Sequence, residues 1–245
     1  MELKQNEQID DLQISGLRII QNNDGFKFGT DAVLLSDFSK DIKSKNTLDL
    51  CCGSGIIPLL LSAKTKTDHF CGIELQPEVS DMAKRSVEMN GLSDKIEIRN
   101  LDLCDALSVY PKRSFDLITC NPPYMRAGSA VLNEQDYKII SRHEVKCTLE
   151  DIIRVSSSLL TLTGHLVLVH RPSRLCDMIY LMRKYRIEPK RIRFVHTVWG
   201  EAPSLVLCDG LYNAKSDVKI LPPLILYNED KTPSEEMKRI YRGEC

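Results

Sequence analysis

The sequence predicts an α/β fold with a doubly wound, mostly parallel sheet of seven strands, one of which, near the C-terminus, is antiparallel. Short apolar runs alternate with longer amphipathic segments from residue 46 to residue 185, the pattern of a parallel sheet with helices on both faces. The last two apolar runs are separated by a short Gly/Pro loop without a helix, which favours a hairpin and therefore one reversed strand. The length of 245 residues with 42% apolar content is sufficient for one such core.

The predicted strands are short and rich in apolar residues, as expected for strands buried on both faces. They cover residues 47–51, 70–74, 96–100, 116–120, 165–170, 192–197 and 205–208. Helices are expected at 56–63, 76–90, 149–162 and 175–185. Pro58 is tolerated in the first turn of the first helix, and Gly91 ends the second.

The segments outside this alternation are shorter. Residues 12–20 predict a small hairpin with Gly16 at its turn. Thr30 is expected to cap a helix that opens at Ala32, and residues 233–242 predict an external amphipathic helix. We expect a single domain over 1–245, in which 1–45 form an N-terminal extension, 46–210 the core and 211–245 a tail.

Charge and cysteine usage limit the classes of function. The formal net charge of −1 means that a nucleic acid would have to meet a local basic patch. The nine cysteines include no C-x-x-C pair, which favours unpaired thiols in a reducing compartment over a zinc site. The polar N-terminus and the lack of an apolar run near ~18 residues argue against a signal peptide or membrane span. We expect a soluble cytoplasmic protein without a metal.

Asn121-Pro122-Pro123-Tyr124 is the most informative stretch of the chain. It follows the predicted strand 116–120, where two adjacent prolines remove N–H donors and hold the backbone extended. The carbonyls of Asn121 and Pro122 are then available to a ligand, and Tyr124 adds an aromatic face. Such a site suits a planar amine, for example the N6 edge of adenine.

A second set of residues lies where three other predicted strands end. Gly53 and Gly55 allow a tight turn after the first strand. Pro58 occupies the place of the third glycine of a dinucleotide fingerprint, which argues against a bound pyrophosphate. Asp49, Glu74 and Asp102 make the rim acidic; Asp102 could equally cap the next helix. A cationic cofactor with a ribose, such as S-adenosylmethionine, fits this rim.

These residues resemble the N-P-P-Y class of S-adenosylmethionine-dependent amino-methyltransferases, and within it the bacterial tRNA1(Val) adenine-37 N6-methyltransferase family. The resemblance extends over nearly the whole chain. The stretches that carry it are Phe28 to Leu35, Asp49 to Gly55, Gly72 to Glu74, Asn121 to Tyr124, and Arg193 to His196. N-P-P-Y is shared with DNA adenine and protein glutamine methyltransferases, so the first and last stretches discriminate better.

The resemblance implies a Rossmann-like class I methyltransferase fold and a role for each site residue. Asp49, Gly53 and Gly55 would surround the methionine part of the cofactor, with Thr30 and Asp31 near its amino acid end. Glu74 would hold the ribose and Asp102 the cofactor's adenine amine. The Asn121 side chain and the Pro122 carbonyl would accept the target N6 hydrogens, while Tyr124 would stack on the base.

The resemblance further implies a tRNA partner that offers its anticodon loop. Two basic groups are candidates for contact with it: Lys138, Arg142, His143 and Lys146, and further on Arg183, Lys184, Arg186, Lys190, Arg191 and Arg193. A solvated charged surface is the competing interpretation for the second group. Three other functions remain open, namely methylation of protein glutamine, methylation of an amine in another nucleic acid, and an RNA-binding scaffold without catalysis. The sequence leaves the oligomeric state open, and we expect a monomer.

Overall fold

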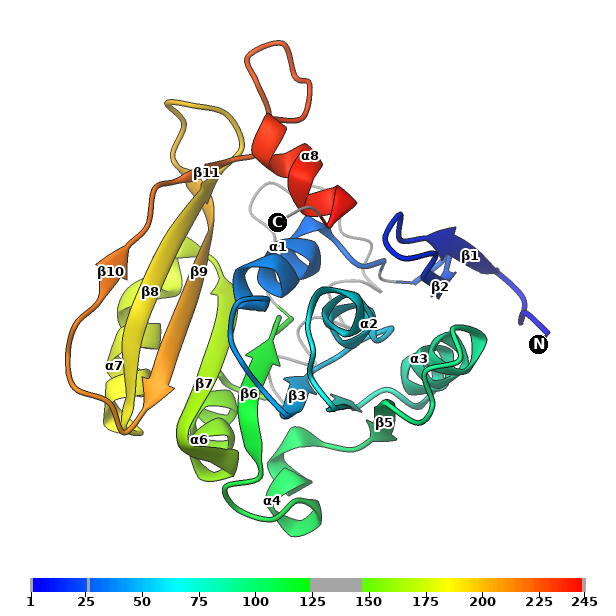
Figure 1. Cartoon of the computed structure of the whole chain (residues 1–245), viewed down its shortest axis with the longest axis horizontal. Coiled ribbons are helices and arrows are strands. Elements are labelled where there is room, and N and C mark those ends of the chain that lie inside the picture. Colours follow the sequence, from blue (N-terminus) through cyan, green and yellow to red (C-terminus); the bar gives the residue numbers. More distant parts are fainter. Residues whose placement is uncertain (1, 26, 124–146, 244–245) are drawn as a thin grey trace.

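The computed structural model describes residues 2–25, 27–123 and 147–243 and contains a nine-stranded sheet with helices on both faces (Figure 1). The strand order is β10-β8-β9-β7-β6-β3-β4-β5, and β11 also pairs with β8. Among the described strands of this sheet, β9 is antiparallel to both of its neighbours, β7 and β8, and the other pairs are parallel. The predicted fold class is therefore confirmed.

The strands of this sheet have the following bounds: β3 Asn46–Leu50, β4 His69–Glu74, β5 Ile96–Asn100, β6 Phe115–Cys120, β7 Leu160–His170, β8 Ile187–His196, β9 Pro203–Tyr212, β10 Lys219–Ile220 and β11 Leu224–Ile225. The two short strands β10 and β11 were not predicted. Each has only two residues, which is too few to show a period of two in the sequence.

Two apolar cores lie on opposite faces of the sheet because successive residues of a strand point to opposite sides. Leu117 of β6 and Val167 of β7 belong to one core, whereas Ile118 and Leu166 belong to the other. The first core is closed by α1 (Thr30–Ser39), α2 (Ile56–Lys64), α3 (Pro77–Met89) and α8 (Glu235–Arg242). The second is closed by α4 (Ala106–Val109), α6 (Leu149–Leu159) and α7 (Leu175–Lys184), with short 3₁₀ turns at Leu103–Asp105 and Pro172–Arg174.

A separate antiparallel hairpin of β1 (Glu7–Asp11) and β2 (Arg18–Asn22) precedes the sheet. Gly16 lies in its connecting loop with φ +68°, but the first strand starts earlier than predicted. The hairpin is held to α3: the Arg85 guanidinium donates to Glu7 at 2.8 Å, and the Ile20 N–H donates to Ser86 Oγ at 2.9 Å.

Three predicted details were wrong. Thr30 is the first residue of α1 rather than its cap, because Gly29 occupies the N-cap position and makes no side-chain cap bond. The helix predicted to reach residue 162 ends at Leu159, since Leu160 is already extended and pairs with Phe115 in the sheet. β8 begins at Ile187, earlier than the predicted start at residue 192, because its first half also pairs with β9. The residues of that half are mostly polar and do not alternate with apolar ones, so the sequence pattern did not predict a strand there.

The carboxyl ends of β3, β4, β5 and β6 meet at one edge of the sheet because these strands are parallel neighbours. This edge brings together the turn at 51–55, the end of β4, the segment 101–103 and residues 121–123. No helix in the part of the chain that the structure describes is both long and apolar enough to cross a membrane.

Candidate active site

A pocket opens at this edge of the sheet. Its lining includes six residues predicted from the sequence: Gly53, Glu74, Asp102, Asn121, Pro122 and Pro123. The residues not predicted are mostly apolar: Phe28, Ala32, Cys51, Cys52, Ser54, Ile56, Ile57, Ile73, Leu75, Gln76, Val79, Leu103 and Cys147. Thr30, Asp31, Asp49 and Gly55 are not part of the lining. The structure thus combines an acidic rim with apolar walls.

The turn after β3 is built from left-handed backbone. Cys51, Gly53 and Gly55 have φ of +60°, +54° and +83°. Cys51 adopts this conformation without being glycine, which is uncommon. Gly55 faces α3, where an added Cβ would lie 3.4 Å from the Ala83 Cβ. Gly55 therefore allows close helix packing, while Gly53 presents its backbone to the pocket.

Glu74 is buried, with 6% of its surface exposed, so it is not a solvated strand end. Its Oε2 accepts a hydrogen bond from the Gly53 N–H at 3.0 Å, and its Oε1 accepts one from the Gln76 N–H at 2.9 Å. Each carboxylate oxygen retains a further lone pair. Glu74 thus fixes the turn after β3 and can still accept hydrogen bonds from a ligand in the pocket.

Asp49 lies beneath the same turn and is 1% exposed. Its position opposite Thr119 in the β3–β6 ladder allows the Thr119 hydroxyl to donate to Asp49 Oδ1 at 2.7 Å. Asp49 Oδ2 is buried without a hydrogen-bond partner. Burial, reinforced by the nearby Glu74 charge and opposed by the Thr119 hydrogen bond, raises the pKa of Asp49 to about 8. Without a ligand, Asp49 is therefore mostly neutral at pH 7.

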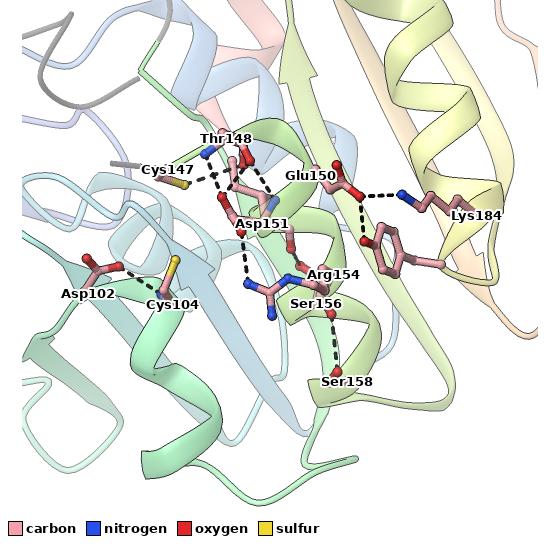
Figure 2. A network of polar contacts seen from close by, with 12 residues as sticks. Asp102, Cys104, Cys147, Thr148, Glu150, Asp151, Arg154, Ser156, Ser158 and Lys184 are labelled. Carbon is pink, nitrogen blue, oxygen red and sulfur yellow. Dashed lines mark hydrogen bonds and ion pairs between the residues drawn. The ribbon is translucent and has the colours of Figure 1, made fainter. Parts of the chain in front are cut away.

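Asp102 both caps a turn and lies at the pocket. Its Oδ1 accepts the Cys104 N–H at 2.9 Å and so caps the 3₁₀ turn after β5. It also lines the pocket. Figure 2 shows Asp102 and Cys104 facing Cys147 and Thr148 at the start of α6. There Thr148 and Asp151 form a reciprocal capping box, in which the Asp151 N–H donates to Thr148 Oγ1 at 3.1 Å.

Asn121, Pro122 and Pro123 follow β6 directly and line the same pocket as Glu74 at the end of β4 and Asp102 after β5. The neighbouring strand β7 ends at His170, which is 7% exposed and accepts the Arg171 N–H on Nδ1 at 2.8 Å. Burial, together with Arg174 and Arg171, lowers the pKa of His170 to about 4. His170 is thus a neutral and weak base. Tyr124 lies outside the described residues.

The thiols of Cys51, Cys120 and Cys147 lie close together. Cys51 interacts with Cys120 and Cys147, and the hydrogen bond with Cys120, together with burial, raises the pKa of Cys51. Burial likewise raises the pKa of Cys120, and the hydrogen bond with Cys51 raises that of Cys147. These thiols stay protonated at neutral pH, so they are poor nucleophiles. No group of three or more His, Cys, Asp or Glu within residues 2–25, 27–123 and 147–243 is arranged to hold a metal ion.

The basic residues predicted to contact RNA divide into three groups. Lys138, Arg142, His143 and Lys146 lie outside the described residues. Arg183, Lys184, Arg191 and Arg193 already have protein partners. Arg183 pairs with Glu188 at 3.1 Å and Lys184 with Glu150 at 2.6 Å, while Arg186 lies in the turn between α7 and β8 with φ +61°. Arg191 donates to the buried Asp209 at 2.7 Å, and Arg193 donates to Glu236 at 2.7 Å and to the Pro222 carbonyl at 2.9 Å. Lys190 lies at the surface, where its ammonium group donates to the Lys215 carbonyl at 2.7 Å.

Arg191 belongs to a structural cluster instead. Asp209, 1% exposed, also binds His165 Nδ1 at 2.7 Å, while the Arg191 guanidinium stacks on Phe38 at 4.7 Å from the ring centroid. A run of charges in sequence cannot distinguish such inward partners from solvent-facing groups. From the sequence alone, Arg191 and Arg193 are therefore indistinguishable from arginines that face solvent and bind phosphate.

Some apolar wall residues carried a signal that the prediction did not use. Leu75 follows Glu74 and Leu103 follows Asp102, so each acidic strand end is succeeded by an apolar pocket residue. A carboxylate beside an apolar surface suits a ribose or amine attached to a flat ring. Phe28 and Cys147 had no such local signal, because they reach the pocket only through folding of distant segments.

Comparisons with known proteins show the family of the chain. Residues 20–185 match the family model for the methyltransferase small domain. Proteins named tRNA1(Val) (adenine(37)-N6)-methyltransferase are similar to the chain. The protein from Porphyromonas gingivalis is 29% identical over 197 residues, 78% of this chain and 76% of that protein. The protein from Mannheimia succiniciproducens is 27% identical over 219 residues, 88% and 86% of the two chains.

Solved structures share the fold. A predicted O-methyltransferase from Agrobacterium tumefaciens superposes with a TM-score of 0.72 at 21% identity, covering 88% of this chain and 97% of that one. A 16S rRNA N2 G1207 methyltransferase from T. thermophilus, in complex with AdoMet and guanosine, superposes with a TM-score of 0.59 at 16% identity, covering 86% and 52%. At these identities the likeness concerns the fold.

Proposed function

This chain belongs to the methyltransferase small domain family, and from that premise we propose that it is an S-adenosylmethionine-dependent methyltransferase acting on the N6 amine of an adenine in tRNA. The observation that carries this proposal is the position of Asn121-Pro122-Pro123. These residues form part of the wall of the pocket that Glu74 and Asp102 also line. The segment proposed to accept the amine and the rim proposed to bind the cofactor are thus parts of one cavity.

The charge of the pocket supports the choice of cofactor. Glu74 and Asp102 line it, so a phosphate would meet carboxyl groups rather than a cation. S-adenosylmethionine has a sulfonium, an ammonium and a ribose diol, and no phosphate. Glu74 would accept hydrogen bonds from the ribose hydroxyls through its remaining lone pairs. Leu75 and Leu103 would contact the adenine ring, with Asp102 accepting from its amine.

The residues at the end of β6 would prepare the target amine. The N6 lone pair of adenine is delocalised into the ring and is a poor nucleophile. If the Asn121 side chain and the Pro122 carbonyl accept both N–H bonds, the nitrogen becomes more tetrahedral and its lone pair is localised. The bound cofactor supplies the electrophilic methyl group, and the remaining contribution of the protein is in-line positioning.

No strong base is required, because the methylated amine is acidic enough to lose its proton to water. The neutral, weakly basic His170 at the neighbouring strand end is consistent with that. The protonated thiols of Cys51, Cys120 and Cys147 also argue against a covalent cysteine adduct of the base.

The substrate proposal goes beyond the fold and draws on the relatives named tRNA1(Val) (adenine(37)-N6)-methyltransferase. We propose adenine 37 of tRNA1(Val) as the target. A base in an anticodon loop is already unpaired, so little energy is needed to bring it into a closed pocket.

The test uses the purified protein, S-adenosylmethionine with a radioactive methyl group, and tRNA from cells lacking the corresponding gene. We expect label in tRNA and N6-methyladenosine among its nucleosides after digestion and mass spectrometry. The Asn121→Ala variant is the control and should label tRNA at most about 1% as fast. Label in a glutamine of protein, or in another nucleoside, would overturn the proposed substrate. A protein that does not bind S-adenosylmethionine would overturn the proposed activity.

A further inference from the structure

Trp199 is the only tryptophan of the chain, and 72% of its surface is exposed to solvent. It lies in the loop that joins β8 to β9, with Gly200 beside it. Tryptophan is largely buried in most proteins, and exposing so large an apolar side chain is unfavourable. An exposed tryptophan on a loop is typical of a recognition site.

The loop lies on the same edge of the sheet as the pocket. β8 is parallel to β6 and β7, so its carboxyl end at His196 is on the edge where β6 ends at Cys120. In Figure 1 the loop between β8 and β9 lies at the upper edge, toward which β6 also points. Three inter-strand steps separate β6 from β8, which corresponds to roughly 15 Å at ~4.8 Å per step. About four or five stacked nucleotides span that distance at ~3.4 Å each.

The loop is braced. His196 Nδ1 lies 2.7 Å from the Glu201 carbonyl oxygen, and the Glu201 N–H donates to the Val198 carbonyl at 3.3 Å. Gly200 at φ +85° closes the turn, and an added Cβ there would meet no atom within 4 Å. At the base of the loop, the Tyr227 N–H donates to the Thr197 carbonyl at 3.0 Å. A braced loop loses little conformational entropy when its side chain stacks on a ligand.

A positive charge lies between the pocket and the loop. Arg171 directly follows β7, the strand between β6 and β9. Its guanidinium donates to the Ser204 carbonyl at 3.3 Å, which directs it toward the start of β9 and the foot of the loop. Arg174 ends the 3₁₀ turn that follows Arg171 and pairs with Asp177 at 2.8 Å. Aromatic and cationic groups along one rim are the combination that binds single-stranded nucleic acid.

We propose that Trp199 stacks on an unpaired nucleotide of the same RNA whose adenine enters the pocket, with Arg171 close to the intervening phosphates. The proposal rests on the proposed function, since it names the surface that holds the RNA while the target base reacts. Trp199 is then a positioning residue for the substrate. It makes no contact with the cofactor.

The single tryptophan makes the test direct. Tryptophan fluorescence of the unmodified protein is measured while a stem–loop RNA with unpaired adenines in its loop is added. A blunt RNA duplex of equal charge is the control probe. We expect strong quenching by the stem–loop and little by the duplex, because only unpaired bases can stack on Trp199. Binding of each RNA is followed independently by anisotropy of a dye on the RNA.

Substitutions give the second readout. Trp199→Ala should weaken stem–loop binding about 5-fold to 150-fold, the range for loss of one base–aromatic stack. In methyl transfer the loss should appear in KM with kcat within about twofold, and Trp199→Phe should recover most of it. The matched control is Tyr180→Ala on α7, which removes a side chain exposed to 67%. It should change stem–loop binding less than twofold.

The outcomes separate this inference from the proposed function. Methyl transfer to RNA with no quenching and an unchanged KM in Trp199→Ala would overturn the role of Trp199 and leave the proposed function standing. No methyl transfer to any RNA would overturn both. Protein self-association that disappears in Trp199→Ala would assign the residue to a second copy of the chain and overturn the RNA contact. Unchanged S-adenosylmethionine affinity in Trp199→Ala shows that the variant is folded.

Discussion

The buried carboxyl group of Asp49 should make cofactor binding depend on pH. In the structure Asp49 Oδ2 has no hydrogen-bond partner and Glu74 lies nearby, so the pKa of Asp49 is raised to about 8, with burial as the main cause. A cationic cofactor beside this carboxyl group favours its ionised form. Binding below pH 8 must therefore expel the proton from Asp49.

The magnitude follows from linkage. Below its pKa, a group that must lose one proton on binding changes the affinity about tenfold per pH unit. S-adenosylmethionine affinity should thus rise about 30-fold from pH 5.5 to pH 7.0, a range in which an α-amino group of pKa ~7.7–8.0 stays mostly protonated. Titration calorimetry at pH 6.5, in buffers with different ionisation enthalpies, should report release of close to one proton per cofactor bound.

The Asp49→Asn variant is the matched control, because asparagine resembles the neutral acid in size and shape. Its affinity should be no higher than that of the unmodified protein at pH 5.5 and should not rise with pH. An affinity of the unmodified protein that is constant over this range would refute the reasoning. Asp49 would then stay neutral in the complex and serve only the hydrogen bond from Thr119.

The same ionisation affects stability without a ligand. The folded-state pKa of about 8 exceeds the unfolded value of ~3.9, so the folded protein keeps a proton that the unfolded chain loses. The contribution of this group to the free energy of unfolding is therefore full below about pH 4 and declines as the pH rises to about 8. Thermal unfolding should show a smaller decline over that range for Asp49→Asn than for the unmodified protein. Equal pH profiles would contradict the assignment.

Three other substitutions test the site and its surroundings. Glu74→Ala should lower S-adenosylmethionine affinity by about 1.5–3 kcal/mol, because it removes a charged acceptor and frees the turn at Gly53; calorimetry of the folded variant measures this, and an unchanged Kd would reduce Glu74 to a structural role. Asn121→Ala should lower single-turnover methyl transfer by ~10² or more with cofactor affinity within a few-fold, whereas retained turnover would remove the amine-positioning role. Arg191→Ala should destabilise the fold by about 3 kcal/mol in denaturant unfolding, because it removes the guanidinium that pairs with the buried Asp209 at 2.7 Å; unchanged stability together with weaker tRNA binding would restore Arg191 to the RNA surface.

The sequence by itself determined the fold class and several of the residues that line the pocket. The period and length of the apolar runs predicted a parallel sheet. Short strands that are buried on both faces and alternate with helices are compatible with few other folds. Gly53, Glu74, Asp102 and Asn121 were found for a related reason. In a parallel sheet the carboxyl ends of neighbouring strands meet at one edge, so residues after strands can be assigned to a site from the chain alone.

The tertiary structure alone decided which polar groups face inward. Arg191 and Lys190 are adjacent in the sequence, yet Arg191 is bound to the buried Asp209 and Lys190 lies at the surface. Likewise Asp49 is sealed beneath the turn whereas Asp102 lines the pocket, although both follow the same strand-end rule. Burial and partners depend on contacts between segments far apart in the chain, and these set the pKa of Asp49 and the exposure of Trp199. Such contacts cannot be read from residue type and spacing alone.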